Sequence, residues 1–395
     1  MMLYQLHIVY AFYNLRLHPL RKYPGPWYFA ASDLPLELCL KYGEVVRVGP
    51  NELSYINTLA WKDVYYHGKE DFISTADRVT HSGMRKASSH AFPDRALREQ
   101  EHIIRRYANR MVSIINGSIH RMGPKSAKHN MVEVYNFTAF DMLTELTFGK
   151  SLHLLDDERY LTWMTAIFQG LKFMTVRGVM KKLSIVGRLS EQLVSRGLRL
   201  PSSSLTLIFS AKLVNERLQR TDNKIPDTRH FVLQRKEDVC LSIPEMHSNA
   251  SGLMIGGAET VATNLSGLTY FLLREPAVLK RLMAEIRDIF QTDKEITLLN
   301  IARLEYFRGI YFGMNASLPC CCCWSAQDCP ARRGKVCNDR ITGKSTVCLS
   351  NHAANRSPSN FSGAEEYLLE GWLGSDNAFV TDRKDVFQPF SVGPR

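Results

Sequence analysis

From His81 onward, apolar residues recur at the three- and four-residue spacing of α-helices, and this pattern constrains the fold more than any other feature of the chain. It predicts amphipathic helices over residues 97–116, 132–148 and 160–176, with Gly149 as the C-terminal stop of the second helix. The pattern therefore predicts a fold that is built mainly from helices.

The longest predicted helix covers residues 245–273. It ends before Pro276, whose ring forbids continuation of that helix but suits the first turn of the next one, predicted over residues 277–290. Breaks in the helical pattern are expected at residues 201–204 and 225–227. Neither break is long enough to act as a linker between two domains, and the sequence contains no internal repeat.

Strand patterns are confined to a short region before the helices. Residues 44–48 alternate like a strand, and residues 53–56 can pair with them as a hairpin. Short helices are expected over residues 34–41 and 60–66. The predicted fold class is therefore mainly α with small β-sheets, in a single domain over residues 21–395.

The first 15 residues are apolar and aromatic, but Gln5, His7 and Asn14 interrupt them. A membrane-spanning helix needs about 20 predominantly apolar residues, and no small-residue cleavage site of a secretory signal peptide follows. A basic cluster and a proline hinge come next. Two alternatives stay open: residues 1–20 are a membrane anchor whose basic flank is cytoplasmic, or they form a buried N-terminal helix.

The composition is that of a basic but otherwise ordinary globular protein. Apolar residues make up 45% of the chain, which indicates neither wholesale disorder nor a polytopic membrane protein. The formal net charge of +11 suits an anionic partner. Lys and Arg are spread along the whole sequence, however, without a motif that reads bases, so we predict no nucleic-acid partner.

The nine cysteines are unevenly placed, because seven of them fall between Cys320 and Cys348. Cys320 and Cys323 have the C-x-x-C spacing of zinc ligands, and further Cys and His residues follow. Four adjacent cysteines cannot all point at one metal, and no second C-x-x-C closes the site. The stretch over residues 320–350 has neither helical nor strand periodicity, so we predict no evolved structure and no metal site there.

Gly256 and Gly257 stand in the middle of the longest predicted helix, where each glycine costs about 1 kcal/mol relative to alanine. Such a cost suggests a function, because glycines let a flat ligand approach the backbone and let the helix open locally. Glu259 and Thr260 then place an acid and a hydroxyl beside the opening. The structural alternative is close packing of helices at the glycines, with the Thr260 hydroxyl bonded back to its own turn.

Two further sets of residues indicate a function only when they are considered together with this helix. His81 and Arg85 have the i, i+4 spacing that puts two side chains on one face of a helix, although a basic surface cluster is the alternative. Near the end of the sequence, Phe390, Gly393 and Arg395 match the pattern Phe-x-x-Gly-x-Arg.

Together and in this order, the motifs resemble the cytochrome P-450 family of haem-thiolate monooxygenases, and within it the fungal isotrichodermin C-15 hydroxylase group. The resemblance covers residues 13–311 and 351–395. It implies the cytochrome P-450 fold and the hydroxylation or oxidation of a lipophilic metabolite of fungal secondary metabolism. It also implies haem b as cofactor, NADPH as electron source through a reductase partner, and the cytoplasmic face of the endoplasmic reticulum membrane.

The resemblance implies catalytic roles for Glu259 and Thr260, which would support proton delivery as oxygen is activated at the haem iron. His81, Arg85 and Arg395 would hold the haem propionates. The residues expected to bind the cofactor are His81, Arg85, Gly256, Gly257, Phe390, Gly393 and Arg395. In the family the loop that begins at Phe390 continues to a Cys whose thiolate binds the iron. The printed sequence stops before that position, so we expect the proximal part of the haem site to be missing from it.

Three positions of a buried ionic clamp depart from the family pattern, which has Glu-x-x-Arg on one helix bonded to a later Arg. Phe312 or Gly313 stands in place of the Glu. Asn315 or Ala316 stands in place of the first Arg, and Gly371 replaces the later one. Loss of all three charges leaves none of them unpaired but removes the clamp on the loop of the Cys ligand.

We therefore expect this exact sequence to be inactive as an oxidase. The first alternative is a sound gene whose written sequence is wrong near Cys320 and at its end. The second alternative, from another class of protein, is a non-catalytic helical remnant that associates with membranes or binds a partner.

Overall fold

The computed structural model of the chain describes residues 39–66, 94–156, 165, 201–219, 242–317, 326–328, 334–341, 345–364, 370–373, 377–389 and 392. The candidate anchor, the predicted helix over residues 160–176 and the break at residues 225–227 lie outside these ranges.

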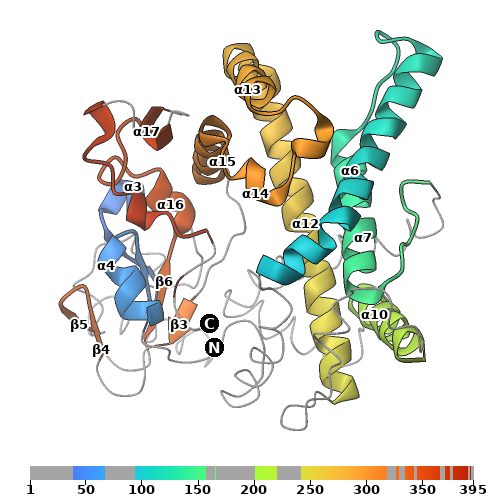
Figure 1. Cartoon of the computed structure of the whole chain (residues 1–395). Coiled ribbons are helices and arrows are strands. Elements are labelled where there is room, and N and C mark those ends of the chain that lie inside the picture. Colours follow the sequence, from blue (N-terminus) through green and yellow to red (C-terminus); the bar gives the residue numbers. More distant parts are fainter. Residues whose placement is uncertain are drawn as a thin grey trace. The chain divides into compact units, whose positions relative to one another are not determined.

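The described residues belong to two compact units, a helical unit and a sheet unit (Figure 1). Helices predominate, and the strands in the described ranges form one four-stranded and one two-stranded sheet. The predicted fold class, mainly α with small β-sheets, is confirmed. A single domain over residues 21–395 stays a prediction.

The helical unit is built on long helices that pack around an apolar core. Helix α12 packs against α7 and α10, and α7 packs against α6. Phe140, Met254 and Ala258 are completely buried between them. The helices are α6 (Asp94–Met122), α7 (Met131–Phe148), α10 (Pro201–Gln219), α12 (Ile243–Arg274), α13 (Pro276–Ile289), the 3-10 turn η5 (Asp293–Glu295) and α14 (Leu298–Ile301). Four predicted helices are thereby confirmed, although α6 extends beyond its predicted range at both ends.

The ends of these helices follow from local chemistry. Helix α7 stops at Gly149, whose φ of 64° favours glycine and whose N–H donates to the Glu145 carbonyl at 2.8 Å. Helix α12 begins with a capping box, in which the Glu245 carboxylate accepts the Ser242 N–H at 2.7 Å. This hydrogen bond lowers the pKa of Glu245. The predicted stop at Gly149 and the boundary at Pro276 are both confirmed.

Two local predictions are wrong. Residues 201–204 are the first turn of α10 rather than a break, because a proline at the start of a helix has no N–H to leave unpaired. Residues 60–66 are not one α-helix: α4 (Thr58–Trp61) passes into a π-helical turn, η3 (Lys62–Tyr66). The apolar spacing of so short a segment does not distinguish the two helical pitches.

The sheet unit contains the predicted hairpin. Strands β1 (Val45–Gly49) and β2 (Glu52–Tyr55) pair antiparallel, which confirms the prediction. The four-stranded sheet has the order β1-β2-β6-β3, with β6 (Thr346–Leu349) parallel to β2 and β3 (Ala326–Asp328) antiparallel to β6. Strands β4 (Gly334–Val336) and β5 (Asp339–Ile341) form the two-stranded sheet.

The prediction that residues 320–350 have no evolved structure is wrong for the described part of this stretch. Strand β6 lies inside the larger sheet, where Val347 and Leu349 pack into one core and Cys348 into another. A strand buried on both faces carries an apolar run instead of an alternating pattern. Four residues of such a run give no periodicity to detect, which is why the sequence did not indicate the strand.

Short helices complete the sheet unit. They are α3 (Cys39–Tyr42), α15 (Glu305–Ser317), α16 (Asn351–Asn355), α17 (Glu370–Leu373) and the 3-10 turns η6 (Asn377–Phe379) and η7 (Lys384–Val386). Across the parts of the chain that the structure describes, no helix is both long and apolar enough to cross a membrane.

Candidate active site

The segment from Gly256 to Thr260 lies in the middle of α12, and the two faces of the helix differ there. Ala258 is completely buried in the core of the helical unit. Gly256 is exposed, and Glu259 and Thr260 are partly exposed. Because residues i, i+3 and i+4 share one face of a helix, Gly256, Glu259 and Thr260 form a single surface opposite the core.

The two glycines have different surroundings. A Cβ atom at Gly257 would lie 3.1 Å and 3.2 Å from the two Cδ atoms of Leu143 on α7. A Cβ atom at Gly256 would meet nothing within 4 Å. Gly257 thus serves the close packing of helices, whereas Gly256 leaves open space beside the backbone.

The Thr260 hydroxyl donates a hydrogen bond to the Gly256 carbonyl at 2.7 Å, four residues earlier in α12. Helix α12 is continuous through this turn, so the predicted local opening is absent and the structural alternative describes this contact. The hydroxyl oxygen keeps acceptor capacity while it donates to the carbonyl. It can therefore still receive a hydrogen bond on the Gly256 side of the helix.

Glu259 is the one acid on this surface of α12. Burial raises the pKa of its carboxyl group above the ordinary range. Within the ranges that the structure describes, no hydrogen bond or ion pair engages this carboxyl. A carboxyl group with a raised pKa keeps its proton to a higher pH than an ordinary surface glutamate, which suits a group that holds and passes on a proton.

The remaining predicted site residues cannot be placed. His81, Arg85, Phe390, Gly393 and Arg395 all lie outside the described residues. The structure therefore brings together Gly256, Gly257, Glu259 and Thr260 and leaves the others as predictions.

An aromatic cluster, formed by Phe312, Phe361, Trp372 and Phe387, lies at and beside positions where the family pattern has its ionic clamp. The Trp372 ring lies 6.2 Å from that of Phe312, 5.9 Å from Phe361 and 5.1 Å from Phe387, measured between ring centroids. Sequence reasoning missed this cluster, since its rings come from separate segments and no local pattern joins them.

The other clamp positions also have packing roles. The Asn315 side chain donates to the Tyr311 carbonyl of its own helix at 2.8 Å. Gly371 is buried, and a Cβ atom there would lie 3.3 Å from two ring carbons of Phe379. At these positions, hydrogen bonding within one helix and close packing thus stand where the family pattern has ionic contacts.

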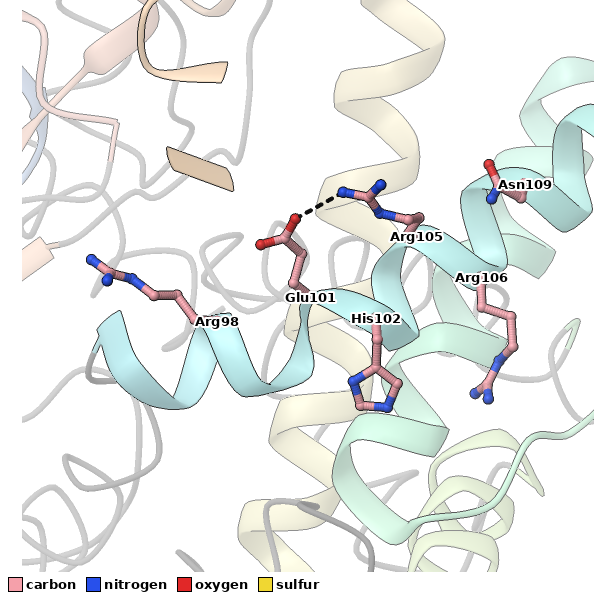
Figure 2. Close-up of a pocket in the computed structure, with 6 residues that line it drawn as sticks. All are labelled: Arg98, Glu101, His102, Arg105, Arg106 and Asn109. Carbon is pink, nitrogen blue, oxygen red and sulfur yellow. Dashed lines mark hydrogen bonds and ion pairs between the residues drawn. The ribbon is translucent and has the colours of Figure 1, made fainter. Parts of the chain in front are cut away.

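An open pocket of about 520 Å³ is lined by α6 residues and is a poor candidate for a ligand site (Figure 2). Two of its three arginines, Arg105 and Arg106, already have partners within the helical unit. Arg105 pairs with Glu101 at 3.1 Å and donates to the Ile296 carbonyl at 2.6 Å. Arg106 pairs with Glu145. Most of the pocket's charge is therefore already paired, and its polar lining residues do not form the apolar wall that a lipophilic molecule needs.

Comparison with known proteins decides the family. The sequence model of cytochrome P-450 matches residues 49–310. The chain is 32% identical to the cytochrome P-450 monooxygenase efuB of Hormonema carpetanum, over 98% of this chain and 83% of that protein. It is also 32% identical to the cytochrome P-450 monooxygenase astA of Talaromyces wortmannii, over 97% of this chain and 83% of that protein. The chain belongs to the cytochrome P-450 family.

Membership of the cytochrome P-450 family implies a haem cofactor. The open space beside Gly256 suits the approach of a flat molecule to the α12 backbone. In the described ranges no cluster of His, Cys, Asp or Glu is placed to hold a metal ion, and Cys320 to Cys323 lie outside them. The narrower likeness to isotrichodermin C-15 hydroxylases stays a prediction.

Proposed function

We propose that this cytochrome P-450 derives from a monooxygenase that hydroxylates or oxidises a lipophilic metabolite of fungal secondary metabolism. Its electrons come from NADPH through an NADPH-cytochrome reductase. The observation that carries the proposal is the surface of α12, where open backbone at Gly256 adjoins the partly buried carboxyl group of Glu259 and the hydroxyl of Thr260. The fungal monooxygenases that match nearly the whole chain support the same reaction class.

When bound, the haem supplies oxygen activation at its iron. Gly256 gives the flat group access to the helix backbone, and Gly257 keeps α12 close to α7. Thr260 accepts a hydrogen bond on the ligand side, while Glu259 holds a proton that it exchanges with solvent. His81, Arg85 and Arg395 bind the propionates, and Phe390 with Gly393 shapes the loop of the iron ligand; these residue roles rest on the family resemblance.

We further propose that this sequence is inactive as an oxidase, because the loop that carries the iron ligand lacks its ionic clamp. Second-shell contacts of this kind typically contribute about 10- to 100-fold to metal affinity or activity. The runner-up function is that of a non-catalytic helical remnant, held at the cytoplasmic face of the endoplasmic reticulum by residues 1–20 or engaged in binding.

Haem titration distinguishes these functions. We would compare the chain as printed, the chain extended by a family-like Asn-Cys-Ile-Gly segment and its helix, and the extended chain with Gly313→Glu, Ala316→Arg and Gly371→Arg. We expect a thiolate-type Soret band in the dithionite-reduced, carbon monoxide-bound form only in the third protein. A stoichiometric thiolate band in the second protein would refute the clamp argument, and one in the first would refute inactivity altogether.

Membrane association needs a separate measurement. Carbonate extraction of the expressed protein should leave it in the membrane pellet if residues 1–20 are an anchor. Deletion of residues 1–20 is the matched control. Complete release of the full-length chain into the supernatant would contradict the anchor.

A further inference from the structure

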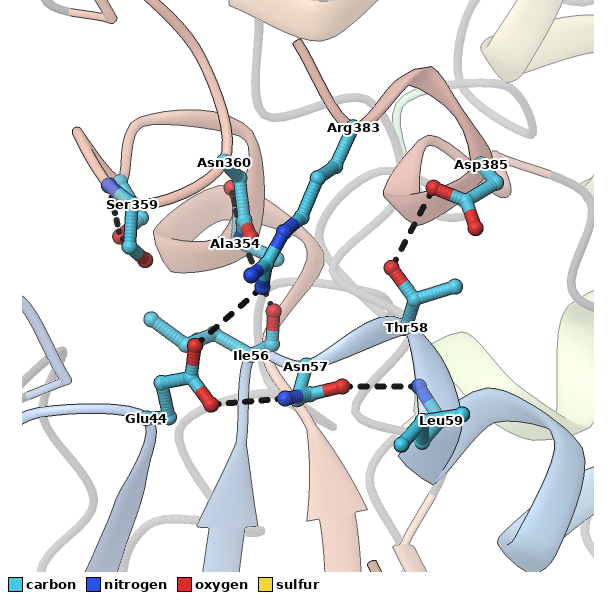
Figure 3. A network of polar contacts seen from close by, with 11 residues as sticks. Glu44, Ile56, Asn57, Thr58, Leu59, Ala354, Ser359, Asn360, Arg383 and Asp385 are labelled. Atoms are coloured by element: carbon cyan, nitrogen blue, oxygen red, sulfur yellow. Dashed lines mark hydrogen bonds and ion pairs between the residues drawn. The ribbon is translucent and has the colours of Figure 1, made fainter. Parts of the chain in front are cut away.

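The segment just before the candidate haem loop is attached to the N-terminal hairpin by contacts that do not involve the clamp positions. The first attachment is at the exit of the hairpin (Figure 3). Asn57 accepts the Leu59 N–H at 2.9 Å and donates its side-chain N–H to the Glu44 carboxylate at 2.7 Å. The other carboxylate oxygen of Glu44 pairs with Arg383 at 3.3 Å. Asn57 thus orients the Glu44 carboxylate that pairs with Arg383.

Asn360 makes the second attachment, and it is only 2% exposed. Its side-chain amide donates to the Ile56 carbonyl at 2.9 Å and to the Ala354 carbonyl at 3.0 Å (Figure 3). Its backbone carbonyl accepts the Arg383 N–H at 2.8 Å. Because both amide hydrogens are used, the orientation of the Asn360 side chain is set by the contacts on either side of it.

A third attachment comes from α4. The buried indole of Trp61 donates to the Val386 carbonyl at 3.1 Å, and the Thr58 hydroxyl donates to the Asp385 carboxylate at 3.3 Å. The next residue, Phe387, has its ring in the aromatic cluster. Residues 383, 385, 386 and 387 thus each contact other parts of the sheet unit, just before the motif that begins at Phe390.

The attachments differ in strength. Glu44 and Arg383 are each more than one-third exposed, at 40% and 46% of the side-chain surface, and exposed ion pairs contribute little to stability. The bonds from Asn360 and Trp61 are buried, and loss of either would leave a buried carbonyl without its donor. Asn360 and Trp61 thus dominate the attachment, and the ion pair adds to it.

We propose that Asn360 and Trp61 are positioning residues that hold residues 383–387, and hence the approach to the haem loop, against the β1–β2 hairpin independently of the ionic clamp. The haem part of this statement rests on the proposed function. The attachment itself does not, since all of its contacts are between residues of the sheet unit.

Hydrogen–deuterium exchange of the full-length, haem-free chain tests the proposal. We would compare Asn360→Asp, which cannot donate to the two carbonyls, with Trp61→Phe, which keeps the ring but loses the N–H. Asn338→Asp is the matched control, because Asn338 is exposed in the same unit. In peptides that cover residues 383–387, loss of one buried hydrogen bond predicts about tenfold faster exchange in Trp61→Phe. Loss of two predicts at least that acceleration in Asn360→Asp, and the control should not change.

Equal exchange in all three variants and the parent chain would overturn the proposal. So would acceleration that spreads equally to β1, β2 and β6, since Asn360 and Trp61 would then serve general stability and not position. Neither outcome depends on haem. Absence of a thiolate band from the third protein of the haem titration would count against the proposed function without affecting this result.

Discussion

Gly257 of α12 faces Leu143 of α7 so closely that any Cβ atom at position 257 would lie within 3.2 Å of both Leu143 methyl carbons. The adjacent Gly256 faces open space. One glycine of the pair therefore sets the distance between two helices, and the other leaves a backbone surface accessible beside Glu259 and Thr260.

Gly257→Ala should destabilise the protein relative to Gly256→Ala. Alanine in place of an exposed helical glycine gains about 1 kcal/mol, and at position 256 nothing opposes this gain. At position 257 the new methyl group overpacks Leu143, which costs about 1–3 kcal/mol. Urea unfolding of both variants measures the difference, and equal midpoints would show that Leu143 moves aside freely.

Asp141→Asn should destabilise the loop after α7. The buried carboxylate of Asp141 accepts the N–H groups of Leu152 and Leu155 at 3.1 Å and 3.2 Å on its two oxygens. Asparagine offers one acceptor oxygen, so one buried N–H loses its partner at a cost of about 1–3 kcal/mol. Asp156→Asn, which changes an exposed ion pair, is the control and should cost about 0–1 kcal/mol.

The cost of Asp141→Asn should also depend on pH. Burial raises the folded-state pKa of Asp141. Its contribution to folding is therefore fully present below the unfolded-state pKa and declines as pH rises through the folded-state pKa. Unfolding free energies measured across the acid range should show the largest gap between parent and variant at the lowest pH. A gap that widens with rising pH would contradict this assignment.

Trp372 and Phe387 should be energetically coupled. Their ring centroids are 5.1 Å apart at an interplanar angle of 68°, an edge-to-face geometry that contributes about 0.5–1.5 kcal/mol beyond the buried area. A double-mutant cycle with Trp372→Leu and Phe387→Leu should yield a coupling energy of that size. Phe387→Leu combined with Val336→Ala, in a different core cluster, should be additive.

Cys337 should react slowly with alkylating agents. Burial, reinforced by the negative charge of Asp63, raises the pKa of the Cys337 thiol to about 11. Since only the thiolate attacks, alkylation near pH 8 should be roughly 100-fold slower than for an ordinary exposed cysteine. Peptide mapping after timed iodoacetamide treatment measures the rate. Asp63→Asn should accelerate it, and a rate equal to that of an exposed thiol would contradict the assignment.

Much of the helical unit could be predicted from the sequence because helices are local. The spacing of apolar residues indicated α6, α7, α12 and α13, and Gly149 with Pro276 marked their ends through restrictions on single residues. The Gly256–Thr260 motif was also visible in the sequence, since all of its members lie within one turn and a half of one helix.

Only the tertiary structure decided which reading of that motif applies to each residue. Periodicity indicated two glycines in a helix, but the position of Leu143 on α7 distinguishes their roles. Some of the decisive contacts join segments roughly 300 residues apart: the parallel pairing of β6 with β2 and the attachments of Asn360 and Trp61. The aromatic cluster brings together rings from several short segments. A four-residue strand that is buried on both faces carries no detectable period. Contacts at long sequence separation leave no local pattern, because side chains meet there only after the chain has folded.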